Sequence, residues 1–94
     1  MKTNELTGVA LDWAVANCEG LLHDDGTVSD YWQPSELWEQ GGPIIEREGI
    51  ALIPGWTAER PGYSADGDTP LIAAMRCYVA SKLGDEVEIP EELK

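Results

Sequence analysis

The segment from residue 69 to residue 84 carries a complete set of helix signals. Thr69 is a typical N-cap, and Pro70 suits the first helical position, where a backbone N–H is not needed. Gly84 is typical of the residue that ends a helix. Apolar residues recur at helical spacing between these ends: Ile72, Met75, Val79 and Leu83, flanked by Leu71, Ala74 and Tyr78. The segment is therefore predicted to be a helix that packs this stripe against the rest of the chain.

A second helix is predicted near the N-terminus, from Gly8 to Glu19. The Thr7 hydroxyl is placed to accept a free backbone N–H of the first turn, and Gly20 is expected to end the helix in the left-handed conformation. The apolar stripe of this helix consists of Leu11, Ala14, Val15 and Cys18, widened by Val9, Trp13 and Ala16. Asp12 and Glu19 are expected to mark its solvent-facing side.

Turn signals dominate the region that follows the first helix. His23–Thr27 is predicted to be a turn in which Gly26 takes a positive φ. Ser35 is placed to cap a single helical turn, Glu36–Gln40, and the sequence Gly41-Gly42-Pro43 is expected to end that turn.

The remaining apolar pairs predict short strands. Ile44 and Ile45 are assigned to one strand and Ile50–Ile53 to another, with a hairpin turn at Glu48-Gly49. Residues 56–68 are rich in Gly, Pro and small polar residues, which is typical of a mobile loop. Glu86–Ile89 alternates between acidic and apolar residues like a short edge strand.

These elements predict an α+β fold, with two main helices packed on a small antiparallel sheet. The 94 residues leave room for one domain, residues 1–94, with loose ends at about 1–5 and 90–94 and a mobile loop at about 56–68. Hydrophobic residues make up 43% and charged residues 26%, which argues against a disordered chain.

The cellular compartment is also constrained by the sequence. No apolar run is long enough to span a bilayer, and the N-terminus lacks the features of a signal peptide, so a soluble cytoplasmic protein is expected. Cys18 and Cys77 are then best interpreted as small buried thiols. The alternative is a Cys18–Cys77 disulfide, which would require the two predicted helices to pack side by side.

The formal charge of −12 comes from 18 acidic and 6 basic residues. It argues against direct nucleic-acid binding, because basic residues supply most of the affinity for phosphates. Two interpretations stay open. In the first, the charge only keeps the protein soluble. In the second, the acidic surface imitates nucleic acid and docks on a basic host protein.

Catalytic and metal-binding motifs are absent from the sequence. His23 is the single histidine, and its neighbours Asp24 and Asp25 are adjacent in sequence, so a turn cannot easily direct all three at one ion. Cys18 and Cys77 have no recognisable base. We therefore expect no enzyme activity, no metal and no cofactor. A cryptic hydrolase would require a cleft that joins His23 to at least two carboxylates.

The aromatic residues are four Trp and three Tyr, with no Phe. Such rings, which carry a polar group, are enriched at binding surfaces. Those outside the two long helices are Tyr31, Trp32, Trp38, Trp56 and Tyr63. With Arg47 and Arg60 among them, they could form a pocket that stacks a base and holds its phosphate. The alternative is that the rings cover a small core.

Several blocks of the chain resemble the NinX-like family of small bacteriophage proteins. They are Leu6–Gly8, Ala10–Ala16, Glu19-Gly20, Pro34-Ser35, Trp38, Gln40–Arg47 and Thr69–Val87. The resemblance implies a phage or prophage setting and an accessory role. The family has no established activity and supplies no catalytic residues. The chain departs from it at Trp32, where the family usually has Tyr, and in a short segment 56–68.

The leading hypothesis is a phage accessory protein in the cytoplasm of the bacterial host that acts as a non-enzymatic binding module. Its predicted site residues are Trp32, Trp38, Arg47 and Trp56. The predicted partner is a nucleotide-like small molecule or a host protein. The alternatives are an acidic decoy that imitates nucleic acid and a cryptic hydrolase. The predicted edge strand Glu86–Ile89 also leaves pairing with a second copy of the chain open.

Overall fold

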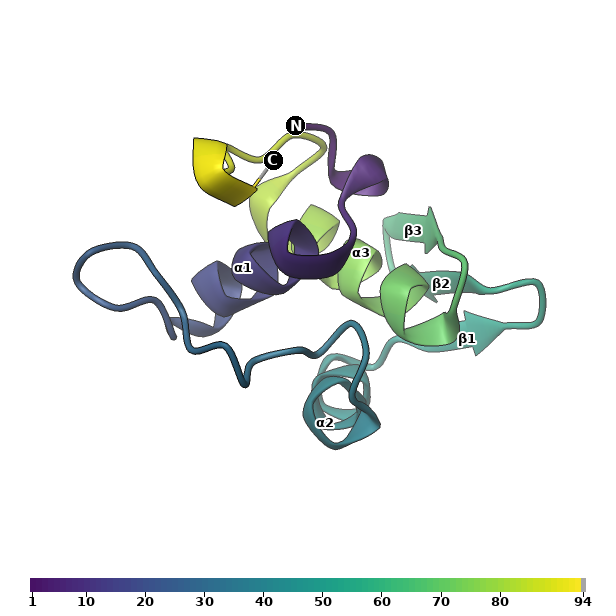
Figure 1. Cartoon of the computed structure of the whole chain (residues 1–94). Coiled ribbons are helices and arrows are strands. Elements are labelled where there is room, and N and C mark those ends of the chain that lie inside the picture. The colour runs from purple at the N-terminus through teal and green to yellow at the C-terminus, as the bar shows by residue number, and fades with distance from the viewer. Residues whose placement is uncertain (94) are drawn as a thin grey trace.

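The computed structural model describes residues 1–93, which form three α-helices and one three-stranded antiparallel sheet (Figure 1). The helices are α1 (Gly8–Glu19), α2 (Trp38–Glu48) and α3 (Pro70–Leu83). The strands are β1 (Ala51–Ile53), β2 (Thr57–Arg60) and β3 (Tyr63–Asp66), in the order β1-β2-β3. Two short 3-10 helices, η1 (Thr3–Glu5) and η2 (Glu91–Leu93), lie near the ends. The predicted α+β class is confirmed.

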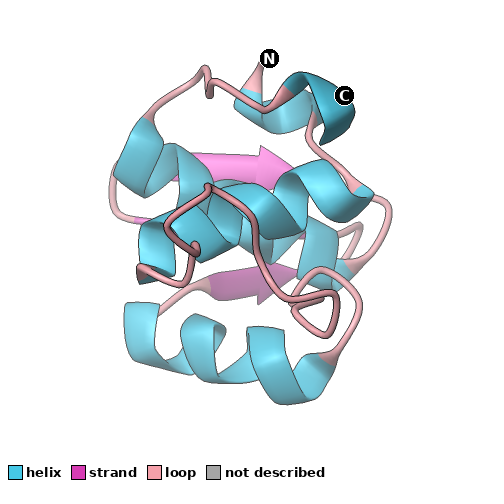
Figure 2. Ribbon diagram, turned by 60° about the vertical axis from the view of Figure 1, so that its left-hand side comes forward, coloured by secondary structure: helices cyan, strands magenta, loops and turns pink. Residues whose placement is uncertain are grey.

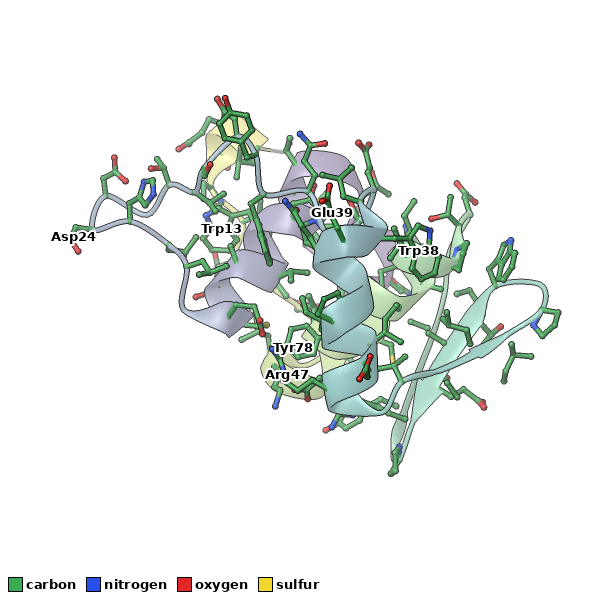
Figure 3. All side chains as sticks on the ribbon, turned by 90° about the horizontal axis from the view of Figure 1, so that it is seen from below. Trp13, Asp24, Trp38, Glu39, Arg47 and Tyr78 are labelled. Atoms are coloured by element: carbon green, nitrogen blue, oxygen red, sulfur yellow. The ribbon has the colours of Figure 1, made fainter. Side chains whose placement is uncertain are left out.

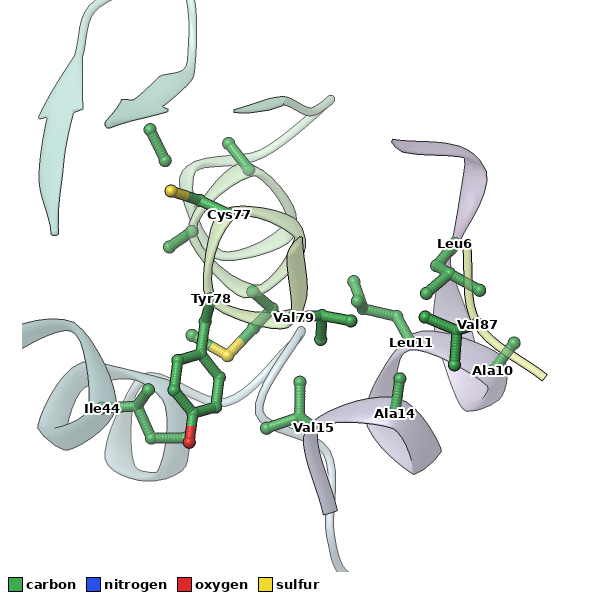
Figure 4. Close-up of a cluster of buried hydrophobic side chains, with 14 of the residues drawn as sticks. Leu6, Ala10, Leu11, Ala14, Val15, Ile44, Cys77, Tyr78, Val79 and Val87 are labelled. Atoms are coloured by element: carbon green, nitrogen blue, oxygen red, sulfur yellow. The ribbon is translucent and has the colours of Figure 1, made fainter. Parts of the chain in front are cut away.

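Helix α3 is the central element of the fold. Its buried residues are Leu71, Ala73, Ala74, Met75, Cys77, Tyr78 and Val79. The sheet lies against one side of α3, while α1 and α2 pack on its other sides. Figure 4 shows Cys77 directed toward the sheet, Tyr78 toward Ile44 of α2, and Val79 toward α1. Small residues on α3 allow this close approach from several directions.

The predicted ends of α3 are confirmed. The Thr69 side chain accepts a hydrogen bond from the Ile72 N–H at 3.1 Å, as an N-cap does. Pro70 is the first helical residue, and the Gly84 N–H donates to the Ala80 carbonyl at 2.9 Å. The local signals at both ends of this helix were therefore sufficient to place it.

The bounds predicted for α1 are also confirmed, and Gly20 is left-handed with φ 72°. Three details were wrong, and the first is Val9, which was assigned to the apolar stripe but is 65% exposed. The Thr7 hydroxyl caps no helix N–H, because Gly8 has φ 53° and the first turn departs from regular geometry. Asp12 does not face solvent, because the chain before α2 crosses over it and the Ser35 N–H donates to Asp12 Oδ1 at 2.9 Å.

Helix α2 corrects the prediction for the centre of the chain. A single turn ending at Gly41-Gly42-Pro43 and a strand at Ile44-Ile45 were expected, but one helix runs through all of these residues. A Cβ on Gly41 would lie 2.5 Å from the Pro34 carbonyl oxygen, so this glycine permits close packing and does not end the helix. Burial of Ile44 in the core outweighs the unfavourable Gly and Pro propensities.

The sheet corrects the prediction for residues 56–68. The predicted strand Ile50–Ile53 is largely confirmed by β1, but its partner is β2 and the Glu48-Gly49 hairpin does not form. The segment predicted to be a mobile loop, 56–68, has regular secondary structure, because it contains β2 and β3. Ala58 is fully buried at the centre of the sheet, opposite Leu52 and Ala65. Its small side chain lets the sheet lie close to α3, a tertiary effect that local composition does not reveal.

The two ends of the described chain lie together (Figure 2). The Met1 amino group donates to the Val87 carbonyl at 3.0 Å, and the Thr3 hydroxyl donates to the Gly84 carbonyl at 2.6 Å. The edge strand predicted at Glu86–Ile89 was wrong, since only an isolated bridge pairs Lys2 with Glu86. Its alternating pattern arises because Val87 and Ile89 enter the core. Residue 94, part of the predicted loose end 90–94, lies outside the described residues.

Two further observations concern the thiols and the helices. Cys77 is buried, Cys18 is half-buried, and both are free thiols. Within residues 1–93, no helix combines the length and the apolar character that crossing a bilayer requires.

Candidate ligand-binding site

A cavity of about 430 Å³ lies between α1, the loop that follows it and the C-terminal segment. The loop contributes lining residues between 26 and 36, and the C-terminal segment contributes lining residues between 90 and 93. Its aromatic and apolar lining residues are Val9, Trp13, Val28, Trp32, Pro90 and Leu93. Its acidic lining residues are Asp12, Asp30, Glu36 and Glu92. The rest of the lining is Gly8, Gly26, Thr27, Ser29 and Gln33. We refer to this cavity as the α1 pocket. Its volume falls within the range of small-molecule sites.

Trp13 holds one wall of the α1 pocket in place. It lies on α1 with 9% of its surface exposed, and its Nε1–H donates to the Gly26 carbonyl at 2.8 Å. The predicted turn His23–Thr27 is confirmed, with the His23 N–H donating to the Thr27 carbonyl at 2.7 Å. Figure 3 shows this turn, marked by Asp24, projecting beyond Trp13. The turn is thereby fixed against α1 at the side of the pocket.

Trp32 contributes a second ring to the α1 pocket. It is half-buried and packs against the core, as do Val28 and Leu93. Its Nε1–H is buried and has no acceptor within residues 1–93. An indole N–H is a donor that usually finds a partner when it is buried. Trp32 therefore places an aromatic ring at the pocket and carries a buried N–H donor that no acceptor in residues 1–93 satisfies.

Asp12 is a residue of the α1 pocket that the sequence did not point to, as is Trp13, which was assigned to the apolar stripe of the helix. Only 5% of the surface of Asp12 is exposed, and none of the ion pairs formed within residues 1–93 includes it. Burial raises the pKa of its carboxyl group, and the nearby charge of Glu36 acts in the same direction. A carboxylate inside the apolar run Ala10–Ala16 was the available signal, because Asp is rarely buried without a cationic partner.

The four predicted site residues are not brought together. Trp32 lines the α1 pocket, whereas Trp38, Arg47 and Trp56 do not. Trp38 is 53% exposed at the start of α2, and Trp56 is 43% exposed in the β1–β2 turn, with φ 64°. Trp38 and Arg47 lie at opposite ends of α2 (Figure 3), about 14 Å apart along its axis at about 1.5 Å per residue.

Arg47 is occupied by contacts within the protein. Its Nη1 and Nη2 donate to the two carboxylate oxygens of Glu19, at 3.0 and 2.6 Å, and its Nε donates to Glu48 Oε2 at 2.8 Å. The guanidinium also lies 5.9 Å from the ring centroid of Tyr78, whose hydroxyl donates to Glu19. These bonds join α1, α2 and α3, so Arg47 has a structural role that competes with the predicted binding of an anionic group.

Glu48 extends this ion-pair network toward the sheet. Arg60 Nη1 lies 2.8 Å and Lys82 Nζ 3.6 Å from Glu48 Oε1. The hydrogen bonds from Arg47 and Arg60 lower the pKa of Glu48 to about 2. Half of the six basic residues of the chain are thus committed to the same small cluster.

His23 lies outside the α1 pocket. It is exposed on the turn, where its Nδ1 lies 3.3 Å from the Thr27 hydroxyl oxygen. The α1 pocket has four acidic residues in its lining, but His23 is not among its lining residues. Across residues 1–93, no group of three or more His, Cys, Asp and Glu side chains is arranged to hold a metal ion. The geometry that a hydrolase would require of His23 is therefore not found at this cavity.

The family model described as "Bacteriophage P22, NinX" matches residues 2–82. The chain belongs to this NinX family. No curated protein matches the sequence. The NinX match includes Asp12, Trp13 and Trp32, but it ends before Pro90 and Leu93, which supply the remaining wall of the α1 pocket.

Proposed function

We propose that this NinX-family phage protein is a non-enzymatic accessory protein that binds a ligand, or a side chain of a partner, in the α1 pocket. The observation that supports this proposal most strongly is the combination found at one cavity. Two tryptophan rings, Trp13 and Trp32, border about 430 Å³ of space together with the buried carboxylate of Asp12. A mainly apolar cavity with a few polar groups, one of them with a perturbed pKa, is the usual form of a binding site.

The lining of the α1 pocket does not suit the nucleotide-like ligand considered from the sequence. Its described lining residues include four carboxylates and no Lys, Arg or His. A phosphate group would be repelled by these carboxylates and would find no cationic partner there. The proposed ligand therefore carries no phosphate.

The test uses the indole N–H signals of the four tryptophans in a two-dimensional NMR titration with benzyl alcohol, a neutral aromatic probe. Saturable shifts confined to Trp13 and Trp32 are expected, because these two rings line the α1 pocket and Trp38 and Trp56 do not. Trp32→Ala should abolish the response of Trp13. The matched control, Trp38→Ala, should leave it intact. Equal shifts at all four rings, or no saturable shift, would contradict the proposal.

A second candidate function is the acidic decoy, which one feature of the C-terminal segment favours. Asp85, Glu86, Glu88 and Glu92 are all exposed there, around the buried Val87 and Ile89. A decoy would bind a basic host protein with an affinity that falls steeply as salt is raised, and nucleic acid would compete with it. Binding to host nucleic-acid-binding proteins that is insensitive to salt would count against this function.

A further inference from the structure

We infer that the α1 pocket selects organic cations, namely an amine or guanidinium carried on an apolar stem. This inference rests on the proposed function, because it assigns the ligand class of the same pocket. Three features of the pocket lead to it. They are the negative charge of its lining, the burial of Asp12 without a cationic partner, and the two tryptophan rings in its walls.

The lining of the α1 pocket is negatively charged, because acidic residues gather there and basic residues lie elsewhere. Asp30, Glu36 and Glu92 join Asp12 at the α1 pocket, and no basic residue is among its described lining. The bases near the core are used elsewhere: three enter the ion-pair network around Glu48, and Arg76 donates to the carbonyl oxygens of Leu6 and Asp66. A cavity with apolar walls concentrates the field of its charges, so this one attracts cations.

Asp12 supplies the most specific argument for a cation. Its Oδ1 accepts the Ser35 N–H at 2.9 Å, and the carboxylate keeps acceptor capacity beyond that bond. A buried carboxylate without a cation is costly to the protein, since desolvation is not repaid by an ion pair. A cationic ligand in the α1 pocket would provide the partner that residues 1–93 do not provide.

The two tryptophan rings of the α1 pocket also favour a cationic ligand. A tryptophan face is the best aromatic partner for a cation, and both Trp13 and Trp32 line the α1 pocket. Val28, Pro90 and Leu93 offer apolar surface for the stem that carries the charge. Aromatic faces with carboxylates nearby form the usual recognition site for alkylammonium groups.

The test compares three probes that share one body and differ in charge: 4-phenylbutylamine, 4-phenylbutanol and 4-phenylbutyrate. Affinities are measured at neutral pH from the Trp13 and Trp32 indole signals. The amine is expected to bind roughly tenfold more tightly than the alcohol, and the carboxylate should not bind measurably. If the alcohol binds as tightly as the amine, the cation inference fails while the proposed function stands. If none of the three probes shifts these signals, both fail.

Variants of the lining acids show whether the charge acts locally. Asp12→Asn keeps an acceptor for the Ser35 N–H and removes the charge, so it should lower the affinity for the amine to that for the alcohol. Glu36→Gln, at an exposed lining position, should weaken amine binding without any risk to the core. The matched control is Glu59→Gln, an exposed acid on β2, which should change nothing. An equal loss in all three variants would attribute the effect to net charge and overturn the inference.

The same chemistry has two sources, a free amine and a basic side chain of a protein. The model compound N-acetyl-lysine methylamide distinguishes them. If it competes for the α1 pocket as well as 4-phenylbutylamine does, the natural occupant is a side chain of a protein partner. If it does not compete while the amine binds, the occupant is a small free amine.

Discussion

At the scale of single residues, Asp12 and Gly41 of this NinX-family protein are both held by contacts with distant parts of the chain. The segment before α2 covers Asp12, whose Oδ1 accepts the Ser35 N–H at 2.9 Å. Gly41 is buried inside α2, and its surroundings leave no room for a Cβ beside the Pro34 carbonyl oxygen. Substitutions at these two positions therefore test burial and close packing directly.

Asp12 is expected to reduce the stability of the protein at neutral pH. Because burial raises its pKa, the ionised form of Asp12 is less favourable in the folded state than in the unfolded state, and it costs free energy that Asn would not. Asp12→Asn should therefore raise the melting temperature at pH 7. The gain should vanish at acidic pH, where the carboxyl group is protonated in both the folded and the unfolded state. The substitution leaves the other three acidic residues of the α1 pocket, Asp30, Glu36 and Glu92, in place in both proteins. Thermal melts across pH test this, and an equal effect at all pH values would contradict it.

Gly41 and Gly42 form a matched pair for testing close packing. A Cβ on Gly41 would lie 2.5 Å from the Pro34 carbonyl oxygen and 2.7 Å from Leu71 Cδ2, so Gly41→Ala should cost about 1–3 kcal/mol despite better helix propensity. On Gly42 the nearest atom would be Trp38 Cε3 at 3.9 Å, so Gly42→Ala should gain up to about 1 kcal/mol. Urea unfolding of both variants measures the difference. Equal changes in the free energy of unfolding would show that helix propensity, and not close packing, sets the effect of both substitutions.

At the scale of elements, the helices with local signals were predictable and the others were not. Both α1 and α3 have a helical stripe and an end-marking glycine, and their predicted bounds are those observed. Helix α2 and the β2–β3 hairpin have weak local signals, and they form because Ile44 and Ala58 are buried against α3. The candidate site was less predictable, since its walls come from α1, the following loop and η2, which are joined only in the folded chain.

The contact of Arg47 with Glu19 and Glu48 is expected to hold α1 and α2 on α3. Arg47→Met should lower the free energy of unfolding by about 1–2 kcal/mol at pH 7, a figure reduced because the arginine side chain is half exposed. Interaction with the arginines lowers the pKa of Glu48 to about 2 from an ordinary 4.5. The contribution of the Arg47–Glu48 ion pair to the free energy of unfolding is therefore complete above about pH 4.5, and it is lost as the pH falls toward 2.

Two measurements check this role of Arg47. Urea unfolding at several pH values should show the difference between Arg47→Met and the unmodified protein shrinking in acid. Binding of 4-phenylbutylamine in the α1 pocket should be unchanged, because Arg47 lines a separate depression with Gly42, Pro43 and Glu46. A stable Arg47→Met variant that has lost amine binding would restore Arg47 as a site residue.

At the scale of the whole molecule, the α1 pocket depends on the C-terminal segment beyond the NinX match. Removal of residues 90–94 deletes the wall formed by Pro90, Glu92 and Leu93 and leaves Val87 and Ile89 in the core. This truncation should weaken binding of 4-phenylbutylamine roughly tenfold or more, while the chain stays folded. Circular dichroism and the NMR titration together measure both properties. Full affinity in a folded truncated protein would show that this wall is dispensable.

The central position of α3 has a consequence for the order in which the protein can be assembled in the cell. The apolar stripe of α1 is synthesised early, but the surface that buries it comes from α3, about 60 residues later in the chain. The bond from Thr3 to Gly84 and the bond from Met1 to Val87 close later still. During synthesis, then, α1 emerges from the ribosome before its partner α3 has been made, and the α1 pocket is complete only after residues 90–93 have followed.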